Sequence, residues 1–281
     1  MIKYFLITIS ILTSIIGKSE NNEPLNKKSN KGRMYAFWGW NREWYTNSDI
    51  HFTGKNYNFT LSDVEATDRQ SKFNVNPYFN LGNLTIPQTN LRVGYFISDK
   101  YDISIGYDHM KYVMKTPQTV KINGNIHSGT PFDNQFINDE ILLDYKFLLF
   151  EHTDGLNYIN TEITRNDDLL TYLKATINPN KLKIHTLLGF GTGIMLPRSN
   201  VLLFNGTRYD EFHLAGFGIS AKAGVDVILF KYFLLRSEYR TGFIGMPSIR
   251  TTPNKEDNAS QSFFFSQINI CFGFTLYPFQ K

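Results

Sequence analysis

Residues 263–279 read FFFSQINICFGFTLYPF and alternate between large apolar side chains and small or polar ones. Side chains two residues apart lie on the same face of an extended strand. One face of this segment carries Ile268, Ile270, Phe272, Phe274 and Leu276, and the other carries Gln267, Asn269, Cys271, Gly273 and Thr275. A strand whose two faces differ this much is expected to separate two different environments.

The same alternation recurs in earlier segments, at 90–98, 101–108, 182–194, 216–227 and 233–243. Across these strands the less apolar face is rich in glycine, at Gly94, Gly106, Gly189, Gly191, Gly193, Gly216, Gly218, Gly224, Gly242 and Gly273. Glycine weakens a strand and is hard to explain on a face that meets water, but it fits where space is short, as in the interior of a narrow barrel. We therefore expect the glycine face to point inward.

Charged residues of both signs share the glycine face. We expect a charge network in the lumen, because opposite charges packed in a small interior can pair, and its members are Arg92, Asp102, Lys222, Asp226, Arg236, Glu238 and Arg240. The apolar face then meets lipid, where a closed barrel gives every backbone N–H and C=O an internal partner. The alternative is a soluble β-sandwich or barrel, which also alternates but buries its apolar face.

The N-terminus has the layout of a secretory signal peptide. Lys3 precedes an apolar run from Tyr4 to Ile16, which is shorter than the roughly 20 residues that a membrane-spanning helix needs. Small residues follow at Gly17 and Ser19, as at a cleavage site. We predict a signal peptide at 1–19, a flexible periplasmic leader at 20–32 and a β-barrel at 33–281.

Short and long connections alternate along the chain. Tight turns are expected near 98–100, 178–180 and 228–231, and long loops near 45–88, 115–155, 196–210 and 245–261. Short turns at one rim and long loops at the other are typical of bacterial outer-membrane barrels. We therefore predict an all-β fold, namely a closed antiparallel transmembrane β-barrel with short periplasmic turns and long extracellular loops.

The number of strands depends on how two segments are interpreted. With a first strand at Met34–Trp44, the chain gives eight strands, and the fourth runs without a break through residue 177. A ten-strand alternative adds 140–149 and 156–165 as a pair. Within the first long loop, HFTGKNYNFTL at 51–61 predicts a hairpin with its tip at 54–56.

Composition excludes several other classes of protein. Of the 281 residues, 42% are apolar, which is enough for a packed core and argues against global disorder. The net charge of +4, from 29 basic and 25 acidic residues, is too balanced for a nucleic-acid-binding protein. The single cysteine excludes an internal disulfide and a cysteine-rich zinc module. We expect neither a cofactor nor a metal.

The chain resembles the small outer-membrane β-barrel proteins of Gram-negative bacteria. The resemblance rests on the signal peptide, the unequal connections, the alternating strands and the aromatic final strand FFFSQINICFGFTLYPF. It spans about residues 33–279 and is architectural, without a motif that singles out one subfamily. It implies an outer-membrane location, outer-membrane lipid as a partner, and room for an extracellular ligand or an envelope protein partner.

Histidine and acidic residues occur together at four places where loops or rims are expected. Such pairs can orient a general base or ligate a metal ion, but polar loops are often rich in these residues, and no HExxH or GxSxG motif accompanies them. The catalytic candidates are His152, Asp154, His51 and Asp49, and the rim candidates are Asp108, His109, Glu211 and His213.

Three functions are compatible with these features. The first is a non-enzymatic barrel that acts in envelope structure or binds a ligand or partner through its outer loops, because the interior of an eight-stranded barrel is just filled by side chains. The second is an uptake channel for small solutes or hydrophobic compounds, which needs a wider or laterally open barrel. The third is a lipid-modifying acyl hydrolase or acyl transferase that uses His152 or His51 with a neighbouring carboxylate.

Overall fold

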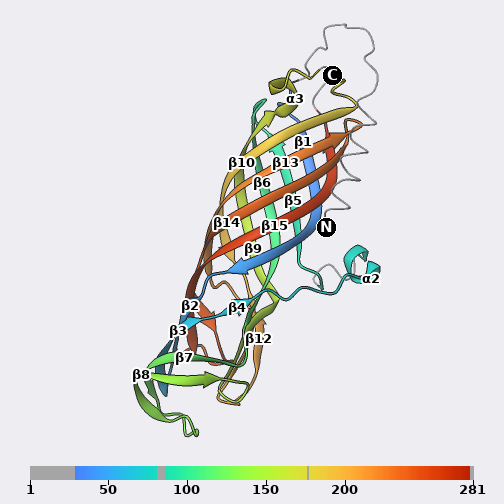
Figure 1. The fold of residues 1–281 in the computed structure, drawn as a ribbon. Coiled ribbons are helices and arrows are strands. Elements are labelled where there is room, and N and C mark those ends of the chain that lie inside the picture. The colour runs from blue at the N-terminus through green and yellow to red at the C-terminus, as the bar shows by residue number, and fades with distance from the viewer. Residues whose placement is uncertain (1–28, 81–85, 176, 279–281) are drawn as a thin grey trace.

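A computed structural model describes residues 29–80, 86–175 and 177–278. The signal peptide expected at 1–19 and most of the leader expected at 20–32 lie outside the described residues. The chain is built mainly of antiparallel strands (Figure 1). No described helix is long and apolar enough to cross a membrane.

Long strands pair side by side to form a ring. They are β1 (Met34–Tyr45), β5 (Thr89–Phe96), β6 (Tyr101–Met114), β9 (Leu148–Asp168), β10 (Leu182–Met195), β13 (Gly216–Leu229), β14 (Phe233–Arg250) and β15 (Asn258–Leu276). Each pairs antiparallel with the next in this order, and β15 also pairs with β1, where Trp38 lies opposite Phe272. The pairing therefore returns to the strand at which it began.

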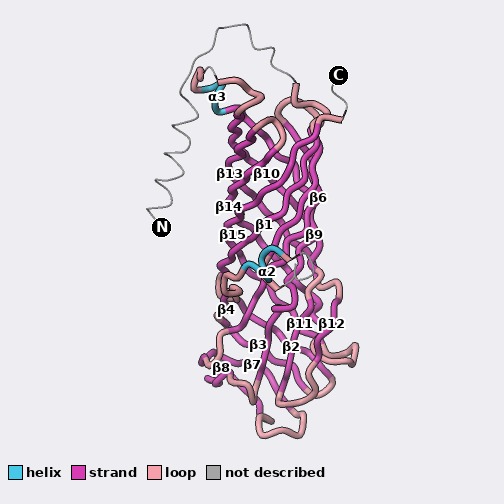
Figure 2. Tube along the Cα trace, turned by 90° about the vertical axis from the view of Figure 1, so that its right-hand side faces the viewer, coloured by secondary structure: helices cyan, strands magenta, loops and turns pink. Residues whose placement is uncertain are grey.

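The two ends of the ring differ. At the end that we call the short-turn end, residues 97–100 join β5 to β6 and residues 230–232 join β13 to β14. Residues 169–181, with the one-turn helix α3 (Leu169–Tyr172), join β9 to β10 at the same end. The opposite end, which we call the long-loop end, carries the connections from β1 to β5, β6 to β9, β10 to β13 and β14 to β15, as Figure 2 shows.

The connection after β9 differs from the expected course. The apolar alternation predicts a strand through residue 177, but β9 ends at Asp168. The carboxylate of Asp168 accepts a hydrogen bond from the Thr171 N–H and caps α3. Asparagine and aspartate side chains compete with a strand by bonding nearby backbone N–H groups, so the capping bond ends β9 early.

The expected loops at the long-loop end are largely made of strands. They are β2 (Ser48–Gly54), β3 (Tyr57–Val64), β4 (Ala66–Thr67), β7 (Gln118–Ile126), β8 (Asn134–Leu143), β11 (Arg198–Leu203) and β12 (Tyr209–Phe212). One group continues from β15 in the order β2, β3, β7, β8, and a second continues from β9 through β11 to β12. The wall of strands thus extends beyond the ring. The ten-strand alternative predicts that residues 140–149 pair with residues 156–165. The structure does not contain this pair, because β8 pairs with β7 instead.

The outer and inner faces of the ring follow the alternation of the sequence. On β15, Ile270 is 62% exposed while its neighbour Asn269 is fully buried. Large apolar side chains are exposed on the outside of neighbouring strands as well, at Leu91, Val93, Ile103, Ile105, Ile163, Leu188, Phe190, Phe217 and Ile219. The ring is therefore apolar outside and polar inside.

Two apolar clusters close the ends of this polar interior. At the short-turn end, a small cluster joins Tyr35, Phe37, Phe96, Ile228, Leu234 and Cys271. At the long-loop end, a larger core includes Phe52, Phe59, Tyr112, Phe150 and Phe263, drawn from both the ring strands and the added strands. The larger core explains why the added strands are ordered, since they bury apolar side chains against the strands of the ring.

Candidate functional site

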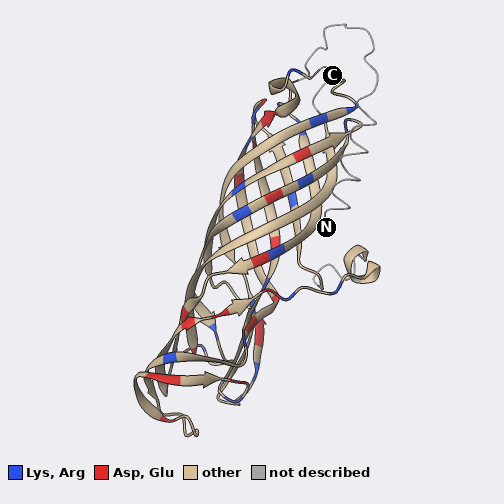
Figure 3. Cartoon of the chain, viewed as in Figure 1, with Lys and Arg blue, Asp and Glu red and all other residues tan. Residues whose placement is uncertain are grey.

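Three basic and three acidic side chains meet in the middle of the ring. The bases are Arg92 on β5, Lys222 on β13 and Arg240 on β14, and the acids are Asp108 on β6, Glu162 on β9 and Glu238 on β14. We call these six residues the central ion cluster. Their side chains are each no more than 2% exposed. Figure 3 shows acidic and basic residues side by side on neighbouring strands of the ring.

Arg240 contacts all three acids of the central ion cluster. Its Nη1 lies 2.5 Å from Asp108 Oδ2, and its Nη2 lies 2.7 Å from Glu162 Oε1 and 3.1 Å from Glu238 Oε1. A guanidinium carries five N–H donors in a fixed plane and suits several carboxylates at once. Arg240 therefore joins β14 to the strands β6 and β9 across the interior.

Glu162 contacts all three bases of the central ion cluster. Besides Arg240, it contacts Lys222 Nζ at 2.5 Å and Arg92 Nη1 at 3.0 Å through its Oε2. Lys222 also reaches Glu238, at 3.3 Å. Burying a charge is costly unless it is paired, and the equal numbers of bases and acids leave the cluster neutral. The cluster fills the middle of the interior without an excess charge.

Glycines make room for these long side chains. A Cβ on Gly106 would come within 2.4 Å of the Arg92 guanidinium, and a Cβ on Gly191 would come within 2.6 Å of Glu162 Cγ. The glycine face that the sequence places inward thus lies against the central ion cluster. Glycine is required there because the interior has no space for a further side chain.

A second polar group lies toward the short-turn end. Arg236 makes two bonds to the carboxylate of Asp226, at 2.6 and 2.7 Å, and its guanidinium lies over the ring of Tyr35. The Tyr35 hydroxyl donates to Asp102 at 2.7 Å, and Asn166 donates to the same carboxylate. The structure thus places all seven residues of the expected charge network, Asp102 included, inside the ring.

Asp108 lies elsewhere than expected. It is predicted at the outer rim beside His109, but it belongs to the central ion cluster and is 1% exposed. The alternation of β6 gives the reason, because Asp108 shares the inward face with Asp102. Glu162 is absent from the expected network, although it alternates with the outward residues Thr161 and Ile163. The strand periodicity therefore contained the signal for both residues.

His152 is buried in the larger apolar core. Its ring lies 5.6 Å from the ring of Tyr112 and 5.1 Å from that of Phe150, and neither ring nitrogen has a hydrogen-bond partner among the described residues. Burial, with a smaller contribution from the charge of His213, lowers the pKa of His152 to about 3. Asp154 is half exposed and pairs with Arg198 at 3.4 Å. His152 and Asp154 therefore do not form an acid–base pair.

The other histidines also bind groups other than their sequence neighbours. His51 Nδ1 lies 2.8 Å from the Thr60 hydroxyl across the β2–β3 hairpin, while Asp49 accepts a hydrogen bond from the backbone N–H of Asp63. His109 Nδ1 lies 2.8 Å from the side-chain oxygen of Asn157. These contacts join strands and loops, which is a structural role.

His213 serves a similar role. Its Nε2 accepts a hydrogen bond from the backbone N–H of Arg250 at 2.9 Å, and its Nδ1 lies 3.5 Å from the backbone oxygen of Glu211. Burial lowers the pKa of His213. In the described part of the chain, no group of three or more His, Cys, Asp or Glu residues is arranged to hold a metal ion.

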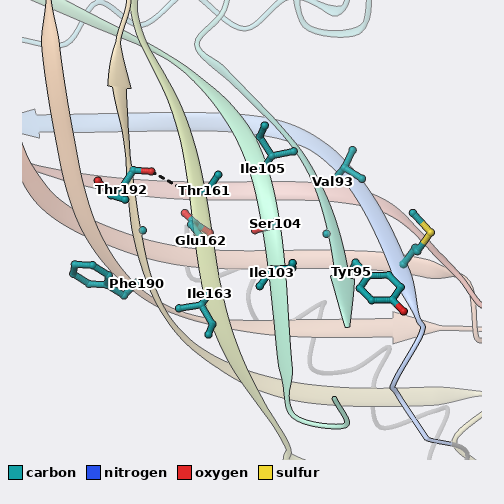
Figure 4. A pocket seen from close by; sticks show the side chains of 13 residues that line it. Val93, Tyr95, Ile103, Ser104, Ile105, Thr161, Glu162, Ile163, Phe190 and Thr192 are labelled. Carbon is teal, nitrogen blue, oxygen red and sulfur yellow. Dashed lines mark hydrogen bonds between the residues drawn. The ribbon is translucent and has the colours of Figure 1, made fainter. Parts of the chain in front are cut away.

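A surface groove lies on the outside of the ring. It has a volume of about 640 Å³ and runs over β5, β6, β9 and β10. Figure 4 shows apolar side chains along it, among them Val93, Ile105, Ile163 and Phe190. The groove belongs to the apolar outer face of the ring and not to its polar interior.

An apolar outside around an interior that holds the charges is the arrangement of membrane-spanning β-barrels. In a soluble protein the exposed face of Ile270, Phe274 and Leu276 would be expected to be polar, whereas outer-membrane barrels carry an outward apolar band. This distribution of apolar and charged side chains agrees with the expected resemblance to small outer-membrane barrels and with the expected outer-membrane location. We call the exposed apolar residues of the ring the outer band.

Comparisons with known proteins gave matches in structure alone. No family model matches the chain, and no curated protein sequence matches it. The neisserial surface protein NspA is 13% identical with a TM-score of 0.33, over 85% of this chain and 99% of that one. OprG from Pseudomonas aeruginosa is 9% identical with a TM-score of 0.35, over 89% and 100%. Ail of Yersinia pestis, bound to the heparin analogue sucrose octasulfate, is 8% identical with a TM-score of 0.29, over 88% and 99%.

Proposed function

We propose that the chain is a non-enzymatic outer-membrane β-barrel that binds a ligand or an envelope partner through its extracellular strands. The eight ring strands form a closed transmembrane barrel, with the short-turn end in the periplasm and the long-loop end outside the cell. This orientation follows the rule that outer-membrane barrels have short periplasmic turns and longer extracellular loops.

The occupied interior is the observation that carries this proposal. The small apolar cluster fills the short-turn end, the central ion cluster fills the middle, and the larger apolar core fills the long-loop end. Such stacking disfavours the uptake channel, since an eight-stranded barrel has an interior just wide enough for its side chains. Contacts of His51 and His152 with groups other than carboxylates disfavour the lipid-modifying enzyme.

The strands of the long-loop end, which are extracellular in this orientation, favour a binding role. These strands and the link after β8 hold exposed apolar side chains, namely Ile137 (77% exposed) on β8, Tyr145 in the link and Phe212 on β12, on a scaffold that is itself packed around a core. Binding residues are often carried on loops that a rigid scaffold positions. A barrel that served only to strengthen the envelope would not need an ordered structure of this size beyond the membrane.

Leakage from vesicles tests the closed interior. Purified chain is inserted into vesicles loaded with a small labelled sugar, and the expected result is that the sugar is retained as well as in protein-free vesicles. Mass spectrometry of the same lipids is expected to show no change in acylation. Steady leakage would contradict the closed barrel, and deacylated lipid would contradict the non-enzymatic role.

The binding role has a separate test. Bacteria that display the chain are compared with bacteria that display Ile137→Ser/Tyr145→Ser, at equal surface levels, for adherence to a panel of protein- and polysaccharide-coated surfaces. Adherence that depends on the two side chains is expected on at least one coating. Equal adherence of both strains to every coating, at the level of bacteria without the chain, would count against binding.

A further inference from the structure

A short aromatic segment of the first long connection lies against the outside of the ring. It comprises residues 71–80 and contains the helix α2 (Val75–Phe79). Phe73 is 74% exposed, Val75 66% and Phe79 52%. Large apolar side chains gathered in this way on a surface mark a site of interaction with another apolar surface.

The segment is continuous with the outer band. The ring of Phe79 lies 5.1 Å from that of Trp40 and 6.5 Å from that of Trp38. Trp38 and Trp40 in turn contact Phe272 on β15, at 5.1 and 5.6 Å between ring centroids. One aromatic surface therefore runs from the wall of the ring onto α2.

The helix α2 lies at the rim of the ring that is nearer the long-loop end. Figure 1 shows it to the side of the ring at the level where β1 ends, and Figure 2, seen from that side, shows it over the part of the ring nearest the long-loop end. Aromatic residues form girdles at this level of outer-membrane barrels, where acyl chains give way to headgroups. The rim level suits a segment that contains both apolar and polar groups.

Polar groups hold the segment and alternate with its apolar side chains. The Tyr78 hydroxyl donates to the backbone oxygen of Ser71 at 2.7 Å, and the Asn74 side chain accepts from the Asn76 N–H at 3.0 Å. Lys72 and Asn80 are exposed beside them. Such a mixture fits the headgroup boundary, where an apolar face sinks into the acyl region and polar groups remain in contact with water.

We infer that residues 71–80 lie in the lipid leaflet nearer the long-loop end and act as a lateral anchor for the barrel. The occupant of the exposed surface is lipid, because the surface continues the outer band without a gap. Phe73, Val75 and Phe79 enter the edge of the acyl region, and Lys72 and the asparagines meet the headgroups. This inference rests on the membrane-spanning barrel of the proposed function.

Fluorescent labels at single cysteines test the anchor. Cys271 is first replaced by alanine, and a polarity-sensitive dye is attached to Val75→Cys, to Ile270→Cys in the outer band, or to Lys255→Cys in the exposed β14–β15 link. Each protein is inserted into phosphatidylcholine vesicles and probed with aqueous iodide and with lipids that carry a nitroxide near the headgroup.

The label at position 75 is expected to be quenched by the lipid nitroxide and to resist iodide several-fold better than the label at position 255. Adding Phe73→Ser/Phe79→Ser is expected to expose it to iodide while the label at 270 is unchanged. Iodide quenching at 75 equal to that at 255 would overturn the anchor. Resistance to both quenchers that is lost on dilution in lipid would also overturn it, because a second copy would then be the occupant.

The label at position 270 distinguishes a failure of the anchor from a failure of the membrane-spanning barrel. If position 270 meets lipid but position 75 does not, the barrel assignment stands and the anchor alone fails. If position 270 is itself quenched by iodide and not by the lipid nitroxide, the membrane-spanning barrel fails, and the anchor fails with it.

Discussion

Glu162 is the one acid of the central ion cluster that reaches Arg92, Lys222 and Arg240 together. Removing its charge leaves three bases facing two acids in a space closed to water. An uncompensated buried charge is among the most destabilising changes that a single substitution can make. The neutrality of the cluster therefore depends on this one carboxylate.

Glu162→Gln is expected to lower the free energy of unfolding by about 3–5 kcal/mol, the range for breaking one partner of a buried ion pair. The measurement is urea unfolding of the protein in vesicles, followed by tryptophan fluorescence. Thr161→Val, at the neighbouring outward position, is the matched control and is expected to change stability little. Equal stability of Glu162→Gln and the control would show that the cluster contributes nothing to folding.

His152 gives stability a dependence on pH. Its pKa is lowered to about 3 by burial, against about 6.5 for an unfolded histidine. Between these two pH values the unfolded chain binds a proton that the folded chain does not, so stability falls as pH falls from about 6.5 toward 3. Above pH 6.5 both states are neutral at this residue and its contribution is constant.

His152→Phe is expected to flatten this acid-side fall, because phenylalanine fits the same aromatic surroundings and binds no proton. Unfolding midpoints at pH 4 and pH 7 provide the comparison. His51→Gln serves as the control, since His51 is only half-buried and bonded to the Thr60 hydroxyl. The account would be wrong if His152→Phe kept the full difference between the two midpoints.

At the scale of the strands, much of the ring could be predicted from the sequence. Period-two alternation assigns a face to each residue independently of its partners, so it identified the inward charges and the outward apolar residues. The hairpin at 51–61 was also predictable, because its tip residues favour a turn, and β2 and β3 pair as expected from Gly54 and Tyr57 outward.

The other strands of the long-loop end could not be predicted in the same way. β7 and β8 are ordered by pairing with β3 and by packing on the larger apolar core, and both contacts join residues far apart in sequence. Local periodicity carries no information about such partners. The sequence could not predict the partners of the histidines either, because His51 bonds Thr60, His152 packs on Tyr112 and His213 accepts from the backbone N–H of Arg250, all from other strands or loops.

The glycine face provides a prediction for the strand β6. Gly106→Val is expected to be destabilising, because the new side chain would occupy the space of the Arg92 guanidinium. Shortening the arginine in the double variant Gly106→Val/Arg92→Ala is expected to give less destabilisation than the sum of the two single changes. A double-mutant cycle of unfolding free energies measures this coupling. Strict additivity would mean that the glycine does not serve to accommodate Arg92.

At the scale of the whole molecule, three layers of side chains follow one another along the axis of the ring. Apolar clusters at the two ends enclose charges in the middle, and the outside is apolar along the ring. This order suits a chain whose middle stands in lipid and whose long-loop end stands in water. In the orientation that we propose, the interior of the long-loop end can be apolar because its exterior faces water and can be polar.

The most direct test of this account is a nitroxide scan of residues 267–274 in vesicles, measuring the collision rate of each label with oxygen, which concentrates in lipid. The account predicts a period of two, with high rates at Ile268, Ile270, Phe272 and Phe274 and low rates at Gln267, Asn269, Cys271 and Gly273. The opposite phase, or rates without alternation, would contradict a strand that turns its apolar face to lipid.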